Sequence, residues 1–204
     1  MEPSQHEIEA LDAARAGDLG AIGPVLESYR ARLARMVSLR MDARLKGRFD
    51  TSDVLQEAFV EASQRLPRYL EDERMPFFLW VRFLVGQKLL QFHRTHLGAE
   101  ARAADREVPL AMAATPSASA VSVAEVWIAH SGTPSQAVAA SEEHARVRAA
   151  LESMSEVDRE VLVLRHFEQL TNIEVSRLLE ITPQTASARY VRALTRIQSV
   201  VGEG

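Results

Sequence analysis

Residues 170–193 read LTNIEVSRLLEITPQTASARYVRA, and this stretch decides the fold class. Thr171 followed three residues later by Glu174 is a capping-box pattern, which predicts that a short helix begins there. Thr182 followed by Pro183 is typical of the start of a second helix, because threonine is a good N-cap and proline suits the first helical position. Two short helices joined by so short a turn predict a helix-turn-helix.

The helix that begins at Pro183 has two different sides. One side is an apolar stripe with spacings of three and four residues: Ala186, Tyr190, Leu194, Ile197 and Val201. The other side has no bulky side chain near the N-terminal end of the helix and carries hydrogen-bond donors. Its residues are Gln184, Thr185, Ala188, Arg189 and Arg192. Such a side fits the major groove of DNA. An ordinary amphipathic helix with solvated arginines would show the same pattern, so the preceding helix and turn are what favour DNA binding.

The rest of the chain also reads as helical, because apolar residues recur at spacings of three and four and few windows alternate with a period of two. We expect helices over about residues 20–45, 50–66, 75–96 and 141–153, with Pro67 ending the second and a further helix following Ser155. The sequence therefore predicts an all-α chain with two small helical domains, residues 1–97 and 141–204.

Residues 98–140 differ in composition and are expected to form a linker. Between Leu110 and Ala140, Glu125 is the only charged side chain when histidine is counted as neutral, and most residues are Ala, Ser, Thr, Pro or Gly. An apolar group around Trp127 lies inside this stretch. We therefore expect part of the linker to dock on a domain.

Composition excludes several classes of protein. The 204 residues include no cysteine, which excludes disulfides, thiolate metal sites and a cysteine nucleophile. No run of eighteen apolar residues is present, so no membrane span is expected. The N-terminal residues carry acids and no apolar stretch, which is unlike a secretory signal. We expect a cytoplasmic protein that uses no cofactor.

Charge is sorted by segment although the net charge is −4. Residues 30–48 carry seven basic side chains and one acidic side chain, whereas residues 50–61 carry four acidic side chains and no basic one. An acidic total is a poor indicator of nucleic-acid binding. The sorting instead predicts separate contact surfaces for separate partners.

The acidic segment is predicted to be a helix whose outward side carries Asp53, Gln56 and Glu57. Acid–base catalysis is one interpretation, but no nucleophile, phosphate loop or complete ligand set accompanies the carboxylates. The side chains could also form a solvated face, or Asp53 could cap the helix with Gln56 reaching back. The remaining interpretation is an acidic docking face for a basic partner.

The helix over residues 75–96 begins with aromatic residues and ends with polar ones. Phe77, Phe78, Trp80 and Phe83 are most simply explained as core. Trp80 together with Gln87, Lys88, Gln91 and Arg94 could instead stack an unpaired base and hold phosphates. His93 and His96 are spaced like metal ligands, but no further ligands are evident, so no metal site is predicted.

Three of these segments, taken in order, resemble the bacterial RNA polymerase sigma factors of the extracytoplasmic-function type. Residues 53–59 (DVLQEAF) look like the D-[LV]-x-Q-E-x-F helix of sigma region 2, and residues 77–81 (FFLWV) are similar to its F-x-x-W-L segment. Residues 170–193 resemble the helix-turn-helix of region 4. The chain departs from the family at Glu180, where a turn glycine is usual, at Phe78, and at Ser187.

The resemblance implies a role for each segment. Asp53, Gln56 and Glu57 would dock on basic clamp helices of the largest polymerase subunit. The loop over residues 70–75 would capture a base flipped from the minus-10 element. The residues implied in minus-10 binding are Arg74, Trp80, Gln87, Lys88, Gln91 and Arg94. Those implied in minus-35 binding are Gln184, Thr185, Ala188, Arg189 and Arg192.

The implied partners are core RNA polymerase and promoter DNA, with an anti-sigma factor left open, and the chain itself would be no enzyme. Two other classes of protein are to be weighed against this one. A stand-alone helix-turn-helix regulator would not need the acidic face or the aromatic helix. A helical adaptor, or a regulator of another sigma factor, would not need the outward side of the last helix.

Overall fold

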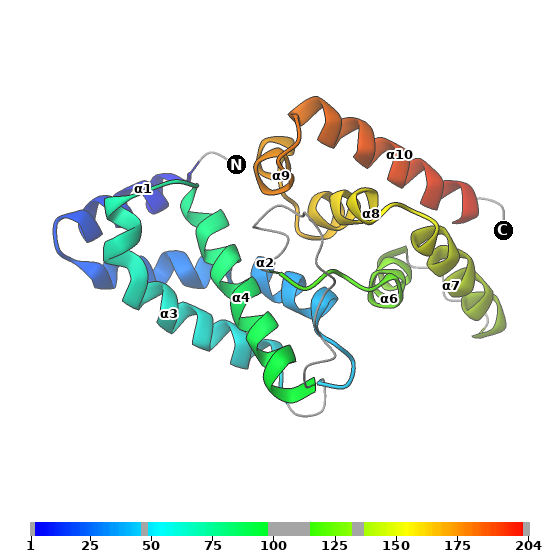
Figure 1. The fold of residues 1–204 in the computed structure, drawn as a ribbon, viewed down its shortest axis with the longest axis horizontal. Coiled ribbons are helices and arrows are strands. Elements are labelled where there is room, and N and C mark those ends of the chain that lie inside the picture. The colour runs from blue at the N-terminus through cyan, green and yellow to red at the C-terminus, as the bar shows by residue number, and fades with distance from the viewer. Residues whose placement is uncertain (1–2, 46–48, 98–114, 132–136, 202–204) are drawn as a thin grey trace. The chain divides into compact units, whose positions relative to one another are not determined.

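The structure is a computed structural model of the chain, and it describes residues 3–45, 49–97, 115–131 and 137–201. Every regular element in these residues is helical, which confirms the all-α fold class (Figure 1). Contacts between residues divide the chain into two compact units, residues 1–116 and 117–204. Within the described ranges, no helix combines the length and the apolar character that crossing a membrane requires.

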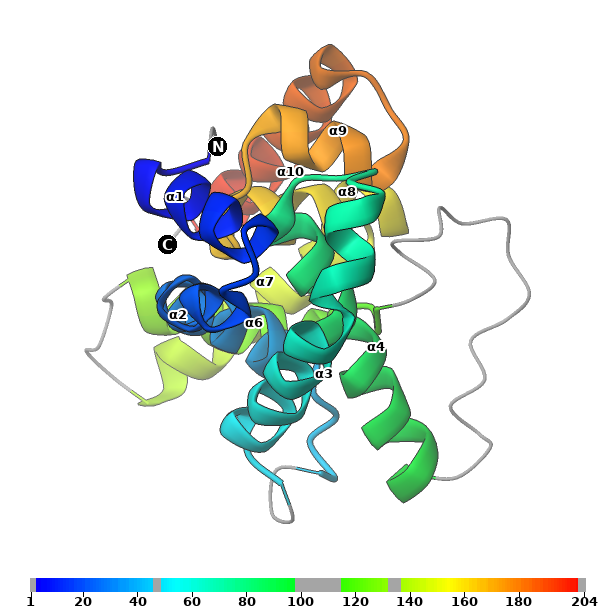
Figure 2. The same ribbon diagram turned by 90° about the vertical axis from the view of Figure 1, so that its left-hand side faces the viewer.

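Three long helices build the first unit: α2 (Gly23–Arg40), α3 (Thr51–Glu71) and α4 (Phe77–Leu97). Each of the three contacts the other two, and Figures 1 and 2 show α3 and α4 side by side. Their apolar faces meet in a core that includes Leu33, Val37, Leu55, Val81 and Leu89, each of which is at most 1% exposed. The three helices expected from the sequence in this unit are therefore present.

A helix before residue 20 is present although the apolar pattern does not predict one. It is α1 (Gln5–Arg15), followed by the short 3-10 helix η1 (Leu19–Ile22). The hydroxyl of Ser4 accepts a hydrogen bond from the backbone N–H of Glu7 and so caps α1. Its buried side consists of two alanines, Leu11 and the stem of Glu7, which is too weak an apolar stripe to stand out in the sequence.

The helix α3 continues past Pro67, so the expectation that Pro67 ends it is wrong. Pro67 is exposed, whereas Leu66 and Tyr69 on either side of it are buried. The Tyr69 hydroxyl also donates a hydrogen bond of 3.0 Å to the carbonyl of Met75. Burial of these neighbours outweighs the penalty for an interior proline, which is typically about 3 kcal/mol.

An aromatic cluster ties α4 to α2 and α3. The rings of Tyr69 and Trp80 lie 4.6 Å apart, those of Tyr69 and Phe77 5.3 Å, and those of Tyr29 and Phe78 5.0 Å. Contacts of this kind stabilise beyond the area they bury. The first turns of α4 are apolar on every side because neighbouring helices surround them.

Helices also make up the second unit, with one π-helical turn among them. Its elements are α6 (Ala120–Ser131), α7 (Ala137–Glu152), α8 (Glu156–Leu162), the π-helical turn η3 (Val163–Phe167), α9 (Asn172–Leu179) and α10 (Pro183–Val201). The helix α10 packs against α7, α8 and α9, and α6 packs on α7. Leu151, Val161, Val175 and Ile197 are completely buried in this unit.

The helix-turn-helix formed by α9 and α10 has the caps that the sequence predicts. Thr171 and Glu174 exchange both capping-box hydrogen bonds, at 3.2 Å and 2.7 Å. The hydroxyl of Thr182 accepts the backbone N–H of Thr185 at 3.1 Å, which caps α10. Glu180 adopts the left-handed conformation, with φ of 53°, at the position where the family has a glycine.

Part of the segment expected as linker, residues 98–140, is folded. Residues 120–131 form α6, and α7 begins at Ala137. Trp127 of α6 stacks on the imidazole of His166 in η3, with ring centroids 4.6 Å apart and an interplanar angle of 24°. The composition hides α6 because alanine is both frequent in linkers and the best helix former. The boundary between the two units accordingly lies after residue 116, inside the expected linker.

Candidate functional site

The outward face of α3 carries the acidic residues that the sequence singles out. Asp53, Gln56 and Glu57 are all exposed. Asp50 is the N-cap of α3, and Asp53 completes the capping box by accepting the backbone N–H of Asp50 at 2.8 Å. The alternative in which Asp53 caps the helix and Gln56 reaches back is therefore wrong. The Asp53 carboxylate is held in place by this hydrogen bond and still faces solvent.

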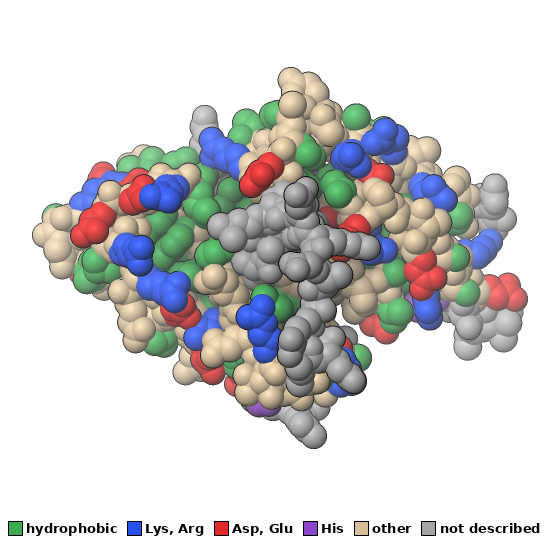
Figure 3. Space-filling view, viewed as in Figure 1, with side chains coloured by type: hydrophobic (Ala, Val, Ile, Leu, Met, Phe, Trp, Pro, Cys, Tyr) green, Lys and Arg blue, Asp and Glu red, His purple; other side chains and the backbone are tan. Residues whose placement is uncertain are grey.

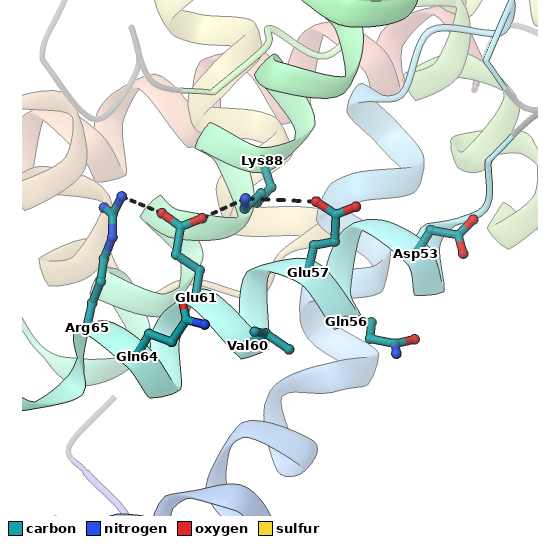
Figure 4. A pocket seen from close by; sticks show the side chains of 8 residues that line it. All are labelled: Asp53, Gln56, Glu57, Val60, Glu61, Gln64, Arg65 and Lys88. Carbon is teal, nitrogen blue, oxygen red and sulfur yellow. Dashed lines mark ion pairs between the residues drawn. The ribbon is translucent and has the colours of Figure 1, made fainter.

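A groove of about 550 Å³ follows this face (Figure 4). The residues that line it come from α3, with one from α4: Asp53, Gln56, Glu57, Val60, Glu61, Gln64, Arg65 and Lys88. Lys88 Nζ lies 2.9 Å from a carboxylate oxygen of Glu61 and 3.8 Å from one of Glu57. Arg65 also pairs with Glu61, at 2.5 Å. The structure therefore brings Lys88 to the acidic face, while the same ammonium group also donates a hydrogen bond of 3.5 Å to Oε1 of Gln91 on α4.

The remaining α4 residues of the minus-10 set share one side of that helix. Gln87, Gln91 and Arg94 are spaced four and three residues apart, and the last two are exposed. Trp80 is half-buried within the aromatic cluster, so much of its ring area is already covered. Arg74, in the loop between α3 and α4, is exposed and pairs with Asp72 at 2.6 Å.

Several side chains of the described part of the basic run, residues 30–45, make contacts within the first unit, while Lys46 and Arg48 lie outside the described residues. Arg30 pairs with Glu27 at 2.7 Å, and Arg32 stacks at 3.9 Å on a phenylalanine ring of α4. Arg44 forms hydrogen bonds with Asp42 that lower the pKa of this carboxyl to about 2. Figure 3 shows basic and acidic side chains interspersed on the face it presents. The described residues of this run therefore do not form a single free basic surface.

The two histidines of α4 have structural surroundings. His93 is buried, and its Nε2 accepts the backbone N–H of Asp42 at 3.3 Å. Burial lowers the pKa of His93, although the carboxylate of Asp42 opposes the shift. His96 packs on Phe49 with ring centroids 4.3 Å apart. Both side chains thus hold the end of α4 against the segment that joins α2 to α3.

The outward side of α10 is exposed over most of its length. Gln184, Ala188 and Arg192 are exposed, and Thr185 is half-buried. The buried side of α10 centres on Ala186, Ala193 and Ile197, whereas Tyr190 and Leu194 of the expected stripe are half-buried.

Arg189 is less exposed than Arg192 because its guanidinium forms a close ion pair within the unit. Its Nη1 lies 2.7 Å from Oδ1 of Asp158 on α8. Arg192 Nη2 lies 3.8 Å from the same oxygen. Burial acts to raise the pKa of Asp158, but hydrogen bonds from Arg189 and Ser155 outweigh it, and the net pKa is lowered. Sequence reasoning missed Asp158 because nothing local connects residues 31 positions apart.

Comparisons with known proteins point to sigma factors. A family model described as Sigma-70, region 4 matches residues 144–197, which extend from α7 into α10. Proteins named ECF RNA polymerase sigma factor SigD, from Mycobacterium bovis and Mycobacterium tuberculosis, are 28% identical over 197 residues, covering 95% of this chain and 84% of each relative. The chain is a sigma factor, and over 95% of its length it is similar to proteins of the extracytoplasmic-function type. The resemblance seen in its three motifs is thereby confirmed.

The fold of this sigma factor has a solved counterpart. The structure of CnrH in complex with the cytosolic domain of CnrY has a TM-score of 0.55 and 19% identity, and covers 98% of this chain and 99% of the other. At this identity the likeness concerns the fold. The likeness in fold extends over the first unit as well, which lies outside the residues matched by the region 4 model.

Proposed function

We propose that this sigma factor binds core RNA polymerase through the exposed face of α3 and directs it to promoters through α4 and α10. The single observation that carries the docking role is the row formed by Asp53, Gln56 and Glu57 on one exposed side of α3, beside a groove. Exposed carboxylates beside Val60, which is 53% exposed, offer a basic partner both charge and apolar contact.

For the minus-10 element, we propose the side of α4 that carries Gln87, Gln91 and Arg94, together with Arg74 and the exposed part of Trp80. These side chains combine amide and guanidinium donors with one aromatic ring, which is the chemistry of single-strand binding. Lys88 of the expected set is paired with Glu61 at 2.9 Å and also reaches Gln91 at 3.5 Å, so it links this side of α4 to the acidic face of α3.

For the minus-35 element, we propose the outward side of α10. Gln184, Thr185 and Ala188 lie in its first two turns, where a recognition helix reaches base edges. Arg192 is well exposed one turn further on and suits a phosphate. Arg189 belongs to the same side, but its guanidinium is oriented by Asp158.

We further propose that the sigma factor catalyses no reaction of its own. Promoter recognition needs binding and the unstacking of bases, and the polymerase forms every bond. An anti-sigma factor as a further partner stays a prediction.

The proposal is tested by titrating core polymerase with the double variant Asp53→Lys/Glu57→Lys. Affinity should fall by roughly 2–5 kcal/mol, as for the loss of close charge pairs at an interface. The matched control is Glu125→Lys/Glu142→Lys, which makes the same change in charge at exposed positions of the second unit. An unchanged affinity of the first variant would sink the docking role of α3. A stand-alone regulator would bind duplex promoter DNA equally well without polymerase, and an adaptor would bind none.

A further inference from the structure

The groove beside α3 is lined by basic as well as acidic side chains, and the two kinds are not evenly distributed along it. The ammonium group of Lys88, which is only 18% exposed, lies between the carboxylates of Glu61 and Glu57 and reaches them from α4. Figure 4 shows Lys88 above α3 with its nitrogen between the two carboxylates. The shortest contact of this ammonium group is with Glu61 on α3, at 2.9 Å, and a longer one of 3.5 Å reaches Oε1 of Gln91 on α4, so Lys88 contributes its charge chiefly to the face of α3.

The two ends of the groove differ in charge. Glu61 is paired with Arg65 at 2.5 Å and with Lys88 at 2.9 Å, so its own charge is more than compensated. Asp53 has only a backbone N–H as its recorded partner, and Glu57 is 56% exposed and 3.8 Å from the ammonium group. The end with Asp53 is therefore anionic, and the end with Arg65 is cationic.

We propose that this polarity selects the partner segment and fixes its direction, an inference that rests on the docking function proposed for α3. The segment of core polymerase that fits the groove carries a basic side chain opposite Asp53 and Glu57. It carries an apolar side chain opposite Val60 and an acidic or amide side chain opposite Arg65. A uniformly basic segment would bring like charges together at the Arg65 end, which disfavours binding. Lys88 is the positioning residue that creates this polarity.

The variant Lys88→Met tests the proposal by the sign of its effect. It keeps most of the aliphatic stem and makes the face more negative by one charge. If Lys88 sets the polarity, affinity for core polymerase should fall by roughly three- to tenfold, which is the effect of about 1 kcal/mol at a partly exposed pair. The dependence of binding on salt should also become weaker, because Glu61 then neutralises Arg65 and the attraction at that end of the groove is lost. Loss of a purely structural contact would leave the salt dependence unchanged. Lys88→Arg should retain the wild-type affinity and salt dependence.

A second variant guards against a folding defect. Arg65 is 53% exposed and lies on α3 with its partner Glu61, so Arg65→Met should leave α4 packed on α3. It should weaken polymerase binding without changing helicity or the free energy of unfolding. The matched control is Arg148→Met, which removes the same kind of pair on α7, with Glu152.

Each outcome is decisive. Tighter binding of Lys88→Met would show attraction to a uniformly basic partner and overturn the proposal. Unchanged core affinity with a weaker promoter complex would make Lys88 a DNA contact and also overturn it. Asp53→Lys/Glu57→Lys is measured in parallel: if this double variant binds normally, the docking function itself fails, whereas if it binds weakly and Lys88→Met binds tightly, only the polarity fails.

Discussion

Arg189 on α10 and Asp158 on α8 form an ion pair of 2.7 Å between two helices of the helix-turn-helix unit. Both side chains are half-buried, at 29% and 24% exposed, and Arg189 Nε is buried without a hydrogen-bond partner. The pair fixes how far the Arg189 guanidinium can extend from α10. Arg192, at 66% exposed, is the more accessible arginine of this side.

Asp158→Asn should lower the stability of the second unit and relax minus-35 preference, although Asp158 need not touch DNA. The charge that orients Arg189 is lost, and a half-exposed pair of this kind contributes roughly 0.5–1 kcal/mol. Because the pKa of Asp158 is lowered in the folded chain, its contribution is present above its unfolded pKa and is lost as pH falls through the folded value. Denaturant unfolding of both proteins should therefore differ at pH 7 and converge in acid. If the variant keeps the same preference across a library of minus-35 sequences, Arg189 has a structural role through its ion pair with Asp158 and does not read bases.

Arg192→Ala should weaken binding to all promoters by a similar factor. A phosphate contact carries no sequence information, and its loss should reduce the salt slope of binding by about one. Filter binding of the reconstituted holoenzyme at several salt concentrations measures this. Altered preference at single bases would instead place Arg192 on a base edge, and core-polymerase affinity serves as the control.

Acidification should destabilise the first unit through His93. Its folded pKa is lowered by burial, so the unfolded chain binds the proton more readily and stability falls as pH drops below the unfolded value of about 6.5. Protonation of Nε2 also removes the acceptor for the Asp42 N–H. Urea unfolding at pH 7.5 and 5.5 should show this loss, and His93→Gln should reduce it. An identical pH dependence in the variant would assign the effect to other groups.

Limited proteolysis of the free sigma factor should cut first between residues 98 and 119 and spare α6. The stack of Trp127 on His166 holds α6 on its unit. Trp127→Ala should open residues 120–131 to cleavage, whereas Trp80→Ala should not. Mass spectrometry of the early fragments identifies the sites. Early cuts within α9 or α10 would contradict the two-unit organisation.

Local signals made the helix-turn-helix predictable. The capping box of Thr171 and Glu174 lies within one turn. The proline at the start of α10 favours a helix start through its own fixed φ angle, so its effect is also local. Glu180 shows the limit of such signals. Its position in the turn, where a glycine is usual, indicates the left-handed conformation that the structure has, whereas glutamate as a residue type does not favour it.

Features that depend on distant residues were not predictable. Pro67 locally favours an end to α3, and only the burial of Tyr69 against α4 overrides it. The place of Lys88 depends on the rotation of α4 against α3, which no single helix pattern specifies. The sequence therefore indicates which faces exist, whereas the pairing of charges across helices comes from packing.

The docking of α6 also shortens the stretch of sequence between the last helix of the first unit and the first helix of the second. With α6 counted in the second unit, the connection runs from residue 98 to residue 119, about half the stretch that ends at residue 140. For a chain segment in general, halving the number of residues lowers the entropic cost of holding both its ends by about 0.6 kcal/mol. Once one unit is bound, the effective concentration of the other rises by a factor of about three. Releasing α6 would lower this effective concentration again and lengthen the connection between the units. The contact of Trp127 with His166 therefore affects both how strongly the two units bind together and how far apart their binding sites can lie.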